Sequence, residues 1–185
     1  MIKEILNYLY YTYEFHFNHI PILAEFYIRF HTPSVKKEIR LFHLTKSDKI
    51  VHIGCGTIPY TAIVIANEVQ ACVLGIDNRS KVVDKAAAFL KKYKALDSIK
   101  IEIGEGTLYD VSGFDVVIIS YGIDHQDLVL RHVFDSMKDG GRIILRRSTA
   151  KKNKYIDSIV KKFSFCNIRL LLTQESILIV KKNQK

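Results

Sequence analysis

The sequence predicts a doubly wound α/β domain that follows a helical N-terminal segment. From residue 49 onward, short apolar strands alternate with helix-like segments, as in a parallel sheet covered by helices on both faces. The first strand leads into a turn that contains Gly54 and Gly56. Near the C-terminal end, the strand-like segments 168–173 and 176–180 follow each other so closely that they must pair antiparallel, because a parallel crossover needs about a dozen residues.

Length and composition fit one domain with an extension. The chain has 185 residues, of which 48% are hydrophobic and 25% charged. It contains no apolar run of about 18 residues, and its first residues lack the features of a signal peptide. We therefore expect a cytoplasmic protein without a membrane partner. Cys55, Cys72 and Cys166 form no CxxC pair, which favours reduced thiols and no metal site.

Residues 1–46 are predicted to form a helical cap on the domain 47–185. The segment contains half of the aromatic residues and no glycine, and its apolar residues recur with a period near 3.6. Pro21 and Pro33 are natural breaks, which predicts helices over 2–18, 20–31 and 34–43. An aromatic surface for stacking nucleic acid bases is the alternative interpretation of this segment.

The remaining elements follow from the alternation of apolar runs and amphipathic stretches. The predicted strands are 49–53, 71–76, 99–103, 115–120, 142–146, 168–173 and 176–180. The predicted helices are 58–67, 80–95, 126–137 and 152–163. This seven-stranded Rossmann-like sheet with an antiparallel last strand resembles the class I S-adenosylmethionine-dependent methyltransferase fold. It differs from the six-stranded, all-parallel NAD-binding domain.

The turn VHIGCGTIPYTA, residues 51–62, bears on the choice of cofactor. Glycines allow positive φ and a close approach of the backbone to a ligand, and the N–H groups at the start of the following helix favour an anion. Thr57 is the predicted N-cap. Pro59 stands where the dinucleotide fingerprint GxGxxG has its last glycine, which disfavours NAD. S-adenosylmethionine has no phosphate and would present its amino acid carboxylate to this turn.

Three further strand ends complete the predicted cofactor site. Asp77 follows the second strand, where a carboxylate can accept hydrogen bonds from a ribose diol, although it could instead cap the helix that begins at Ser80. The segment 104–107 is either an adenine-binding turn or a surface turn. The predicted cofactor-binding residues are Gly54, Cys55, Gly56, Thr57, Asp77, Asn78, Glu105, Gly106, Thr107 and Ser120. The Cys55 thiol is interpreted as a small packing group within the turn.

Within the superfamily, the chain resembles nicotianamine synthases over roughly residues 49–150. The likeness lies in VHIGCGTIPYTAIVIA, which resembles their loop GxGPLPLT, in IGEGTLYDVSGFDVVIIS, and in IILRRSTA, where Arg147 and Ser148 match an arginine followed by a small hydroxyl residue. Tyr60 departs from the usual aliphatic residue, and the N-terminal helical part is shorter than in those enzymes.

The resemblance implies a transferase that uses S-adenosylmethionine on a small amine or an amino-acid-like acceptor. Either the methyl group or the aminocarboxypropyl group could be transferred, because placement of the nucleophile selects the carbon that reacts. An amine acceptor must lose a proton, and Tyr60, Tyr121 and Glu14 are the candidate catalytic residues, with Glu25 as an alternative to Glu14. Asp124 and His125 could line the pocket or cap the next helix.

The second hypothesis is an RNA-binding protein or RNA methyltransferase. The formal charge is +9, and seven basic residues in the C-terminal third could form a phosphate-binding face. They are Arg146, Arg147, Lys151, Lys152, Lys154, Lys161 and Lys162. The fourth strand ends in SYGI, which lacks the motif that holds a flipped base. His16 and His19 are interpreted as surface or partly buried histidines and not as metal ligands, and a homodimer is compatible with the sequence.

Overall fold

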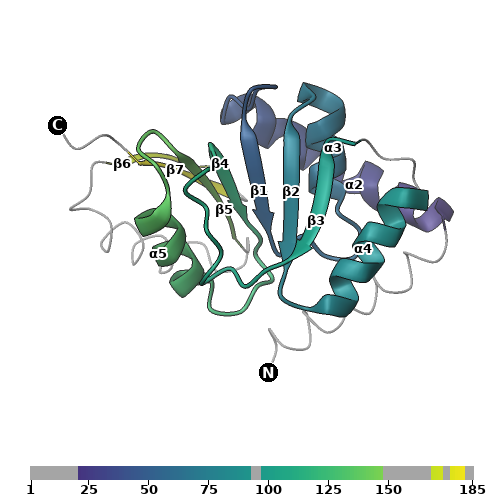
Figure 1. Ribbon diagram of the computed structural model, residues 1–185. Coiled ribbons are helices and arrows are strands. Elements are labelled where there is room, and N and C mark those ends of the chain that lie inside the picture. The colour runs from purple at the N-terminus through teal and green to yellow at the C-terminus, as the bar shows by residue number, and fades with distance from the viewer. Residues whose placement is uncertain (1–20, 93–96, 148–167, 173–175, 182–185) are drawn as a thin grey trace.

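The computed structural model describes residues 21–92, 97–147, 168–172 and 176–181 (Figure 1). The helices are α2 (Pro21–Leu41), α3 (Tyr60–Val69), α4 (Ser80–Lys92) and α5 (Gln126–Ser136). The strands are β1 (Lys49–Ile53), β2 (Cys72–Asp77), β3 (Ile99–Ile103), β4 (Val116–Ile119), β5 (Arg142–Arg146), β6 (Ile168–Leu172) and β7 (Ser176–Lys181). The helices predicted over 2–18 and 152–163 lie outside the described residues.

The strands form one seven-stranded sheet in the order β3-β2-β1-β4-β5-β7-β6. The neighbours from β3 to β5 are parallel, whereas β7 is antiparallel to both β5 and β6. The predicted doubly wound sheet with a reversed last strand is therefore confirmed. Strand order reverses between β1 and β4, and at such a switch point the loops beyond the strand ends separate and leave room for a ligand.

Each face of the sheet carries its own apolar cluster. One cluster lies under α2, α3 and α4 and includes Ile50, Ile118 and Ile144. The other lies under α5 and includes Val51, Val117 and Ile143. Successive residues of β1, β4 and β5 thus alternate between the two clusters, as the pleat of a strand requires. Figure 1 shows α5 on the opposite side of the sheet from α2, α3 and α4.

The N-terminal segment corrects one prediction. Pro33 lies inside the single helix α2 and does not separate two helices. A proline within a helix costs about 3 kcal/mol because it lacks an N–H and crowds the preceding turn. Here Pro33 is exposed, and buried residues on both sides of it, Ile28 and Val35, belong to one apolar cluster. Their burial on both sides of Pro33 stabilises the helix and offsets the cost of the proline.

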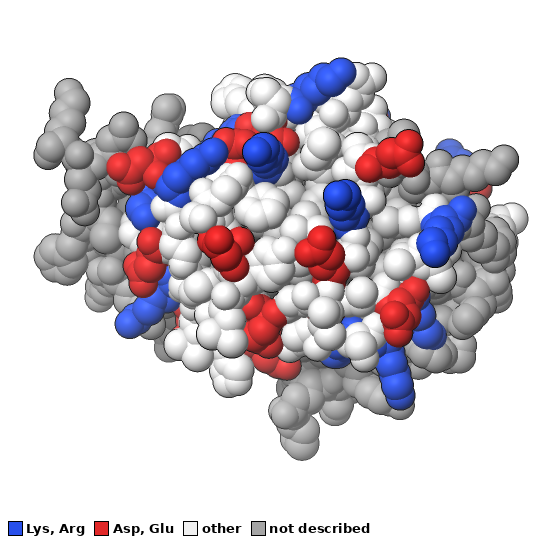
Figure 2. Space-filling view, viewed as in Figure 1, with Lys and Arg blue, Asp and Glu red and all other residues white. Residues whose placement is uncertain are grey.

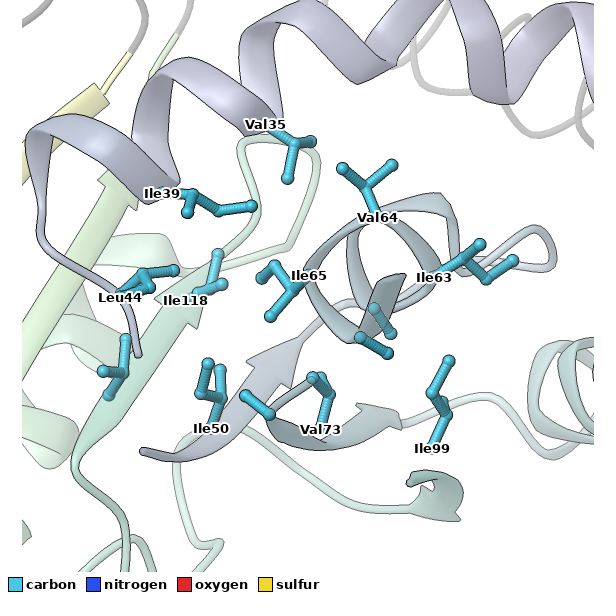
Figure 3. Close-up of a cluster of buried hydrophobic side chains, with 14 of the residues drawn as sticks. Val35, Ile39, Leu44, Ile50, Ile63, Val64, Ile65, Val73, Ile99 and Ile118 are labelled. Carbon is cyan, nitrogen blue, oxygen red and sulfur yellow. The ribbon is translucent and has the colours of Figure 1, made fainter. Parts of the chain in front are cut away.

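The packing of α2 onto α3 joins the N-terminal segment to the core of the domain. In Figure 3, Val35 and Ile39 of α2 point toward Val64 and Ile65 of α3, above Ile118 of the sheet. All five side chains are buried. The sequence period of 3.6 residues predicted a helix here correctly, but Ile22, Phe26 and Phe30, which follow that period, are exposed and do not belong to the buried face. The division of the chain at residue 46 into two domains stays a prediction.

Candidate active site

The predicted site residues gather where β1, β2 and β4 end. The glycine turn follows β1, Asp77 is the last residue of β2, and Ser120 follows β4. The segment 104–107, which follows β3, lies next to them, because Gly104 N donates to Asp77 O at 3.0 Å. The topology therefore brings four separate sequence segments to the switch point of the sheet.

The glycine turn is held by the neighbouring strand. Gly54 and Gly56 have φ values of +77° and +71°. The N–H groups of Gly54 and Cys55 both donate to the Ile76 carbonyl, at 2.8 and 3.0 Å. A Cβ on Gly54 would stand 2.4 Å from Ile123 Cγ2. Backbone conformation and space therefore both require glycine at position 54.

Thr57 does not cap the following helix. Helix α3 begins at Tyr60, its N-cap residue is Pro59, and no side chain caps it. Thr57 lies earlier in the chain and is fully buried, and Cys55 is buried as well. The prediction was wrong because Pro59 adopts a non-helical backbone conformation with ψ 55°, which delays the start of the helix. A ligand in the turn would meet backbone groups before it met these two side chains.

Asp77 is buried at the end of β2 with 4% of its surface exposed, and it binds Arg79. Arg79 donates from Nε to Oδ1 at 3.0 Å and from Nη2 to Oδ2 at 3.3 Å. The Arg79 backbone N–H also donates to Oδ1, at 3.2 Å. Asp77 thus helps to shape the entry to α4, while its Oδ2, which accepts one hydrogen bond, keeps a lone pair for another donor.

Asn78 and Glu105 contact each other although they follow different strands. Asn78 Nδ2 donates to Glu105 Oε2 at 3.0 Å, and Thr107 donates to Oε1 from its N–H and its hydroxyl. The hydrogen bond from Asn78, followed by those from Thr107, lowers the pKa of Glu105. Gly106 is buried against Ile53, where a Cβ would stand 2.7 Å from Cγ2. This arrangement joins the second and third strand ends into one wall of the site.

Ser120 connects the fourth strand end to the glycine turn. Its hydroxyl donates to the Gly54 carbonyl at 2.9 Å, and it lies 2.8 Å from Nε2 of His52. His52 was not among the predicted site residues, because the apolar strand KIVHI gives no sign that its histidine faces the end of another strand. The one sequence feature that could have singled out His52 is its polarity, because an ionisable residue is unusual within an apolar parallel strand.

A second polar cluster lies beneath α2 and α3, beside the end of β5. Arg146 forms a two-pronged ion pair with Glu38, from Nε to Oε1 at 3.0 Å and from Nη2 to Oε2 at 2.7 Å. Its Nη1 donates to Thr61 Oγ1 at 2.8 Å and to the Tyr60 hydroxyl at 3.4 Å. Ser176 donates to Glu38 as well. Sequence reasoning missed Glu38, because its partner is 108 residues away.

The described structure places two of the three candidate catalytic residues, Tyr60 at the start of α3 and Tyr121 after β4. Tyr60 stacks on His31 with ring centroids 4.6 Å apart, and it belongs to the cluster beneath α2. Tyr121 follows β4 and is 38% exposed. Glu14 lies outside the described residues, as do His16 and His19. Glu25 is exposed on α2.

The residues after Tyr121 lead into α5. Asp124 and His125 are both exposed, and His125 is the N-cap residue of this helix, with φ 49° and no capping hydrogen bond from its side chain. Gln126 joins the ends of β4 and β5, because its amide nitrogen donates to the carbonyls of Ser120 and Arg146, each at 2.9 Å. The side-chain cap predicted for Asp124 or His125 is therefore absent, and Gln126 fixes the start of the helix.

A profile of the family described as protein-L-isoaspartate(D-aspartate) O-methyltransferase matches residues 9–181. The chain belongs to this family. It is therefore a member of the class I methyltransferase superfamily, a transferase whose cofactor is S-adenosylmethionine. The resemblance predicted for the superfamily is confirmed. A search of curated protein sequences finds no match.

Solved structures share the fold of this methyltransferase. An S-adenosylmethionine-dependent methyltransferase from Methanococcus maripaludis has 14% sequence identity and a TM-score of 0.73, over 93% of each chain. A mutant of the nicotianamine synthase MtNAS in complex with S-adenosylmethionine has 20% identity and a TM-score of 0.71, over 87% of this chain and 65% of that one. An RNA methyltransferase from Salinibacter ruber in complex with S-adenosylhomocysteine has 17% identity and a TM-score of 0.60, over 83% and 94%.

No described helix is long and apolar enough to cross a membrane. No three histidine, cysteine, aspartate or glutamate side chains within the described ranges form a group that could hold a metal ion.

Proposed function

We propose that the protein transfers the methyl group of S-adenosylmethionine to an amino-acid-like acceptor. The observation that supports this most directly is the buried Asp77 carboxylate beside a glycine turn that tolerates no side chain. In this proposal Asp77 accepts hydrogen bonds from the ribose diol, and Glu105 and its neighbours flank the adenine. The N–H of Gly56, which has no acceptor within the described residues, faces the amino acid carboxylate.

These residues fit the chemistry of the cofactor. S-adenosylmethionine supplies a methyl group made electrophilic by a sulfonium. The acceptor forms a bond to this carbon while the S–CH₃ bond breaks and its electron pair stays on sulfur. The protein must therefore hold the acceptor atom in line with that bond, and such placement accounts for several kcal/mol of the barrier.

A carboxylate oxygen is the acceptor atom that we propose. Carboxylates are ionised at neutral pH and can attack without a base, whereas an amine must first lose a proton. The family is described by O-methylation of an aspartate-derived group, which agrees with a carboxylate acceptor. If the acceptor is a carboxylate, Tyr60 is not needed as a base. Its contacts with His31 and Arg146 then indicate a structural role. Transfer of the aminocarboxypropyl group to an amine is the second candidate, which the loop with Pro59 favours.

The test combines binding with identification of the spent cofactor. Calorimetry should detect S-adenosylmethionine and S-adenosylhomocysteine, and Asp77→Ala should weaken both by about 10-fold or more, because hydrogen bonds to a buried charge are lost. Asp84→Ala on the exposed face of α4 is the matched control and should bind as the wild type does. Binding of NAD alone would contradict the proposal.

Product analysis decides between the two transfers. The enzyme is incubated with an isoaspartyl peptide, with free amino acids and with primary amines. Formation of S-adenosylhomocysteine with a methylated carboxylate supports the proposal. Methylthioadenosine as the spent cofactor would instead show transfer of the aminocarboxypropyl group and would overturn it.

The basic residues in the described part of the chain give little support to the hypothesis of nucleic acid binding. Arg146 was counted toward a phosphate-binding face, but its side chain is only 13% exposed and pairs with Glu38. Lys151, Lys152, Lys154, Lys161 and Lys162 lie outside the described residues. Figure 2 shows acidic residues interspersed with basic ones over the face it presents. RNA binding with a steep dependence on salt would favour this hypothesis, which stays a prediction, as does a homodimer.

A further inference from the structure

His52 is an ionisable side chain buried in the centre of the sheet. It is 2% exposed and belongs to β1, between Val51 and Ile53. Burial of an imidazole without compensating hydrogen bonds costs about 1–3 kcal/mol. An aliphatic residue would avoid this cost, so the contacts of His52 must account for its presence.

The hydrogen bonds of Ser120 fix which nitrogen of His52 carries the proton. The Gly54 carbonyl can only accept, so the single hydroxyl proton of Ser120 must point to it. The Ser120 oxygen is then an acceptor toward His52, and Nε2 of the imidazole must be the donor. The three groups form one directed chain, from His52 Nε2–H to Ser120 Oγ–H to the Gly54 carbonyl.

The other nitrogen of the ring has no hydrogen-bond partner in the part of the chain that the structure describes. His52 Nδ1 is buried and makes no hydrogen bond within the described residues. Burial, together with the positive charge of Arg146, holds the pKa of His52 well below its usual range. The ring is therefore neutral near pH 7, and its one proton is committed to Ser120.

The chain of hydrogen bonds clamps the glycine turn from one side, while β2 holds it from the other. The Gly54 N–H donates to Ile76 of β2, and the Gly54 carbonyl accepts from Ser120 beyond β4. The peptide planes on both sides of Gly54 are thereby fixed before any ligand arrives. A binding site that is already ordered loses less conformational entropy when its ligand binds.

We propose that His52 is a positioning residue, which acts through Ser120 to hold the glycine turn in the shape that binds the cofactor. This proposal rests on the assignment of the turn to S-adenosylmethionine. It also gives Ser120 a new role, because its proton is used on the Gly54 carbonyl and only its second lone pair can face a ligand.

The test uses His52→Leu, His52→Gln, Ser120→Ala and the double variant His52→Leu/Ser120→Ala. Leucine fills the buried space but has no hydrogen-bond donor. Glutamine keeps a donor, because its amide nitrogen is as many bonds from Cα as Nε2 of histidine. The affinity for S-adenosylmethionine is measured by calorimetry. Amide hydrogen exchange at residues 54–57 is measured without ligand, and unfolding by urea reports stability.

We expect His52→Leu and Ser120→Ala each to weaken binding about 10-fold and to speed exchange of the turn amides. The affinity of the double variant for S-adenosylmethionine should lie within about 2-fold of that of the weaker single variant. Both changes break the same series of hydrogen bonds, so their effects should not add. His52→Gln should bind within about 3-fold of the wild type. If His52 had a purely structural role, all the variants would be less stable, and His52→Gln would not restore the affinity for S-adenosylmethionine.

Three results would overturn the proposal. They are wild-type affinity and wild-type exchange in His52→Leu, fully additive losses in the double variant, or no rescue by glutamine. Should His52→Leu fail to fold, the comparison of His52→Gln with Ser120→Ala decides by the same criteria. Failure of the wild type to bind S-adenosylmethionine would count against the proposed function, and the exchange measurement would still decide the role of His52.

Discussion

Glycine at position 54 is required by its surroundings and by its backbone angle together. Gly140 offers a contrast, because its φ of +79° is nearly the same but, apart from its chain neighbours, no atom of the described residues lies within 4 Å of the place where its Cβ would be. The pair therefore separates the cost of a left-handed conformation from the cost of a steric clash.

We predict that Gly54→Ala lowers both stability and cofactor affinity, whereas Gly140→Ala lowers stability alone. Each alanine costs about 1 kcal/mol for the positive φ. At position 54 the clash with Ile123 adds about 1–3 kcal/mol and displaces the turn. Urea unfolding and calorimetry with S-adenosylmethionine measure the two effects. Equal affinities in the two variants would contradict this account.

Single residues differ in how far the sequence alone could place them. The sequence alone places Gly54 and Gly56 in a turn and Asp77 at a strand end, because each has a local signature, a glycine before a helix or a carboxylate after a strand. Glu38 and His52 have none, since their partners Arg146 and Ser120 are 108 and 68 residues away in the chain. Only the pairing of strands and helices brings such partners together.

At the scale of elements, two arginines of β5 hold α2 against the sheet. Arg142 and Arg146 are four residues apart and therefore face the same side. Arg142 donates to the carbonyls of Phe42 and His43 just beyond the helix, at 3.0 and 2.7 Å, and pairs with Asp48. Arg146 binds Glu38 in the last turn of α2. These contacts anchor the C-terminal end of α2 to the sheet.

Another carboxylate joins three elements at the amino ends of the central strands, which is the end of the sheet away from the candidate site. Asp115 precedes β4, accepts from the backbone N–H of Lys49 at 2.8 Å, and pairs with Lys138 at 2.6 Å. The bond to Lys138, followed by that to Lys49, lowers the pKa of Asp115 from its ordinary value of 3.8. The unfolded chain therefore binds a proton more readily than the folded protein.

We predict that Asp115→Asn lowers the free energy of unfolding by about 1 kcal/mol at pH 7. The stability that the ionised carboxylate contributes is present above pH 3.8 and is lost as the pH falls through the lower pKa of the folded state. The difference between variant and wild type should accordingly vanish in acid. Urea unfolding from pH 7 to pH 2.5 tests this, with Asp84→Asn as an exposed control. A difference that does not shrink between pH 7 and pH 2.5 would exclude the charge as its cause.

For the whole molecule, the pair of Glu38 and Arg146 links the N-terminal helix to the C-terminal half of the sheet. Both side chains are largely buried, at 6% and 13% exposure. Ser176 of β7 and Thr61 of α3 complete the cluster, so four elements meet there. Loss of one partner would leave a buried charge beside the core.

We predict that Glu38→Leu and Arg146→Met each lower the free energy of unfolding by about 3–5 kcal/mol. The double variant should lose much less than the sum, because it leaves no unpaired charge. Unfolding by urea, followed for all three proteins and the wild type, measures the coupling. Additive losses would mean that the two side chains contribute independently.

The sequence by itself determined the order of strands and helices, the reversed last strand and the family resemblance. These features follow from local patterns of hydrophobicity, glycine and chain length, which act over a few residues. The tertiary structure decided that α2 runs through Pro33, that Thr57 is buried instead of capping a helix, and that His52 and Glu38 find partners on distant elements. Such outcomes depend on burial and hydrogen bonds between segments that meet only when the sheet has formed, and no local pattern records which segments these will be.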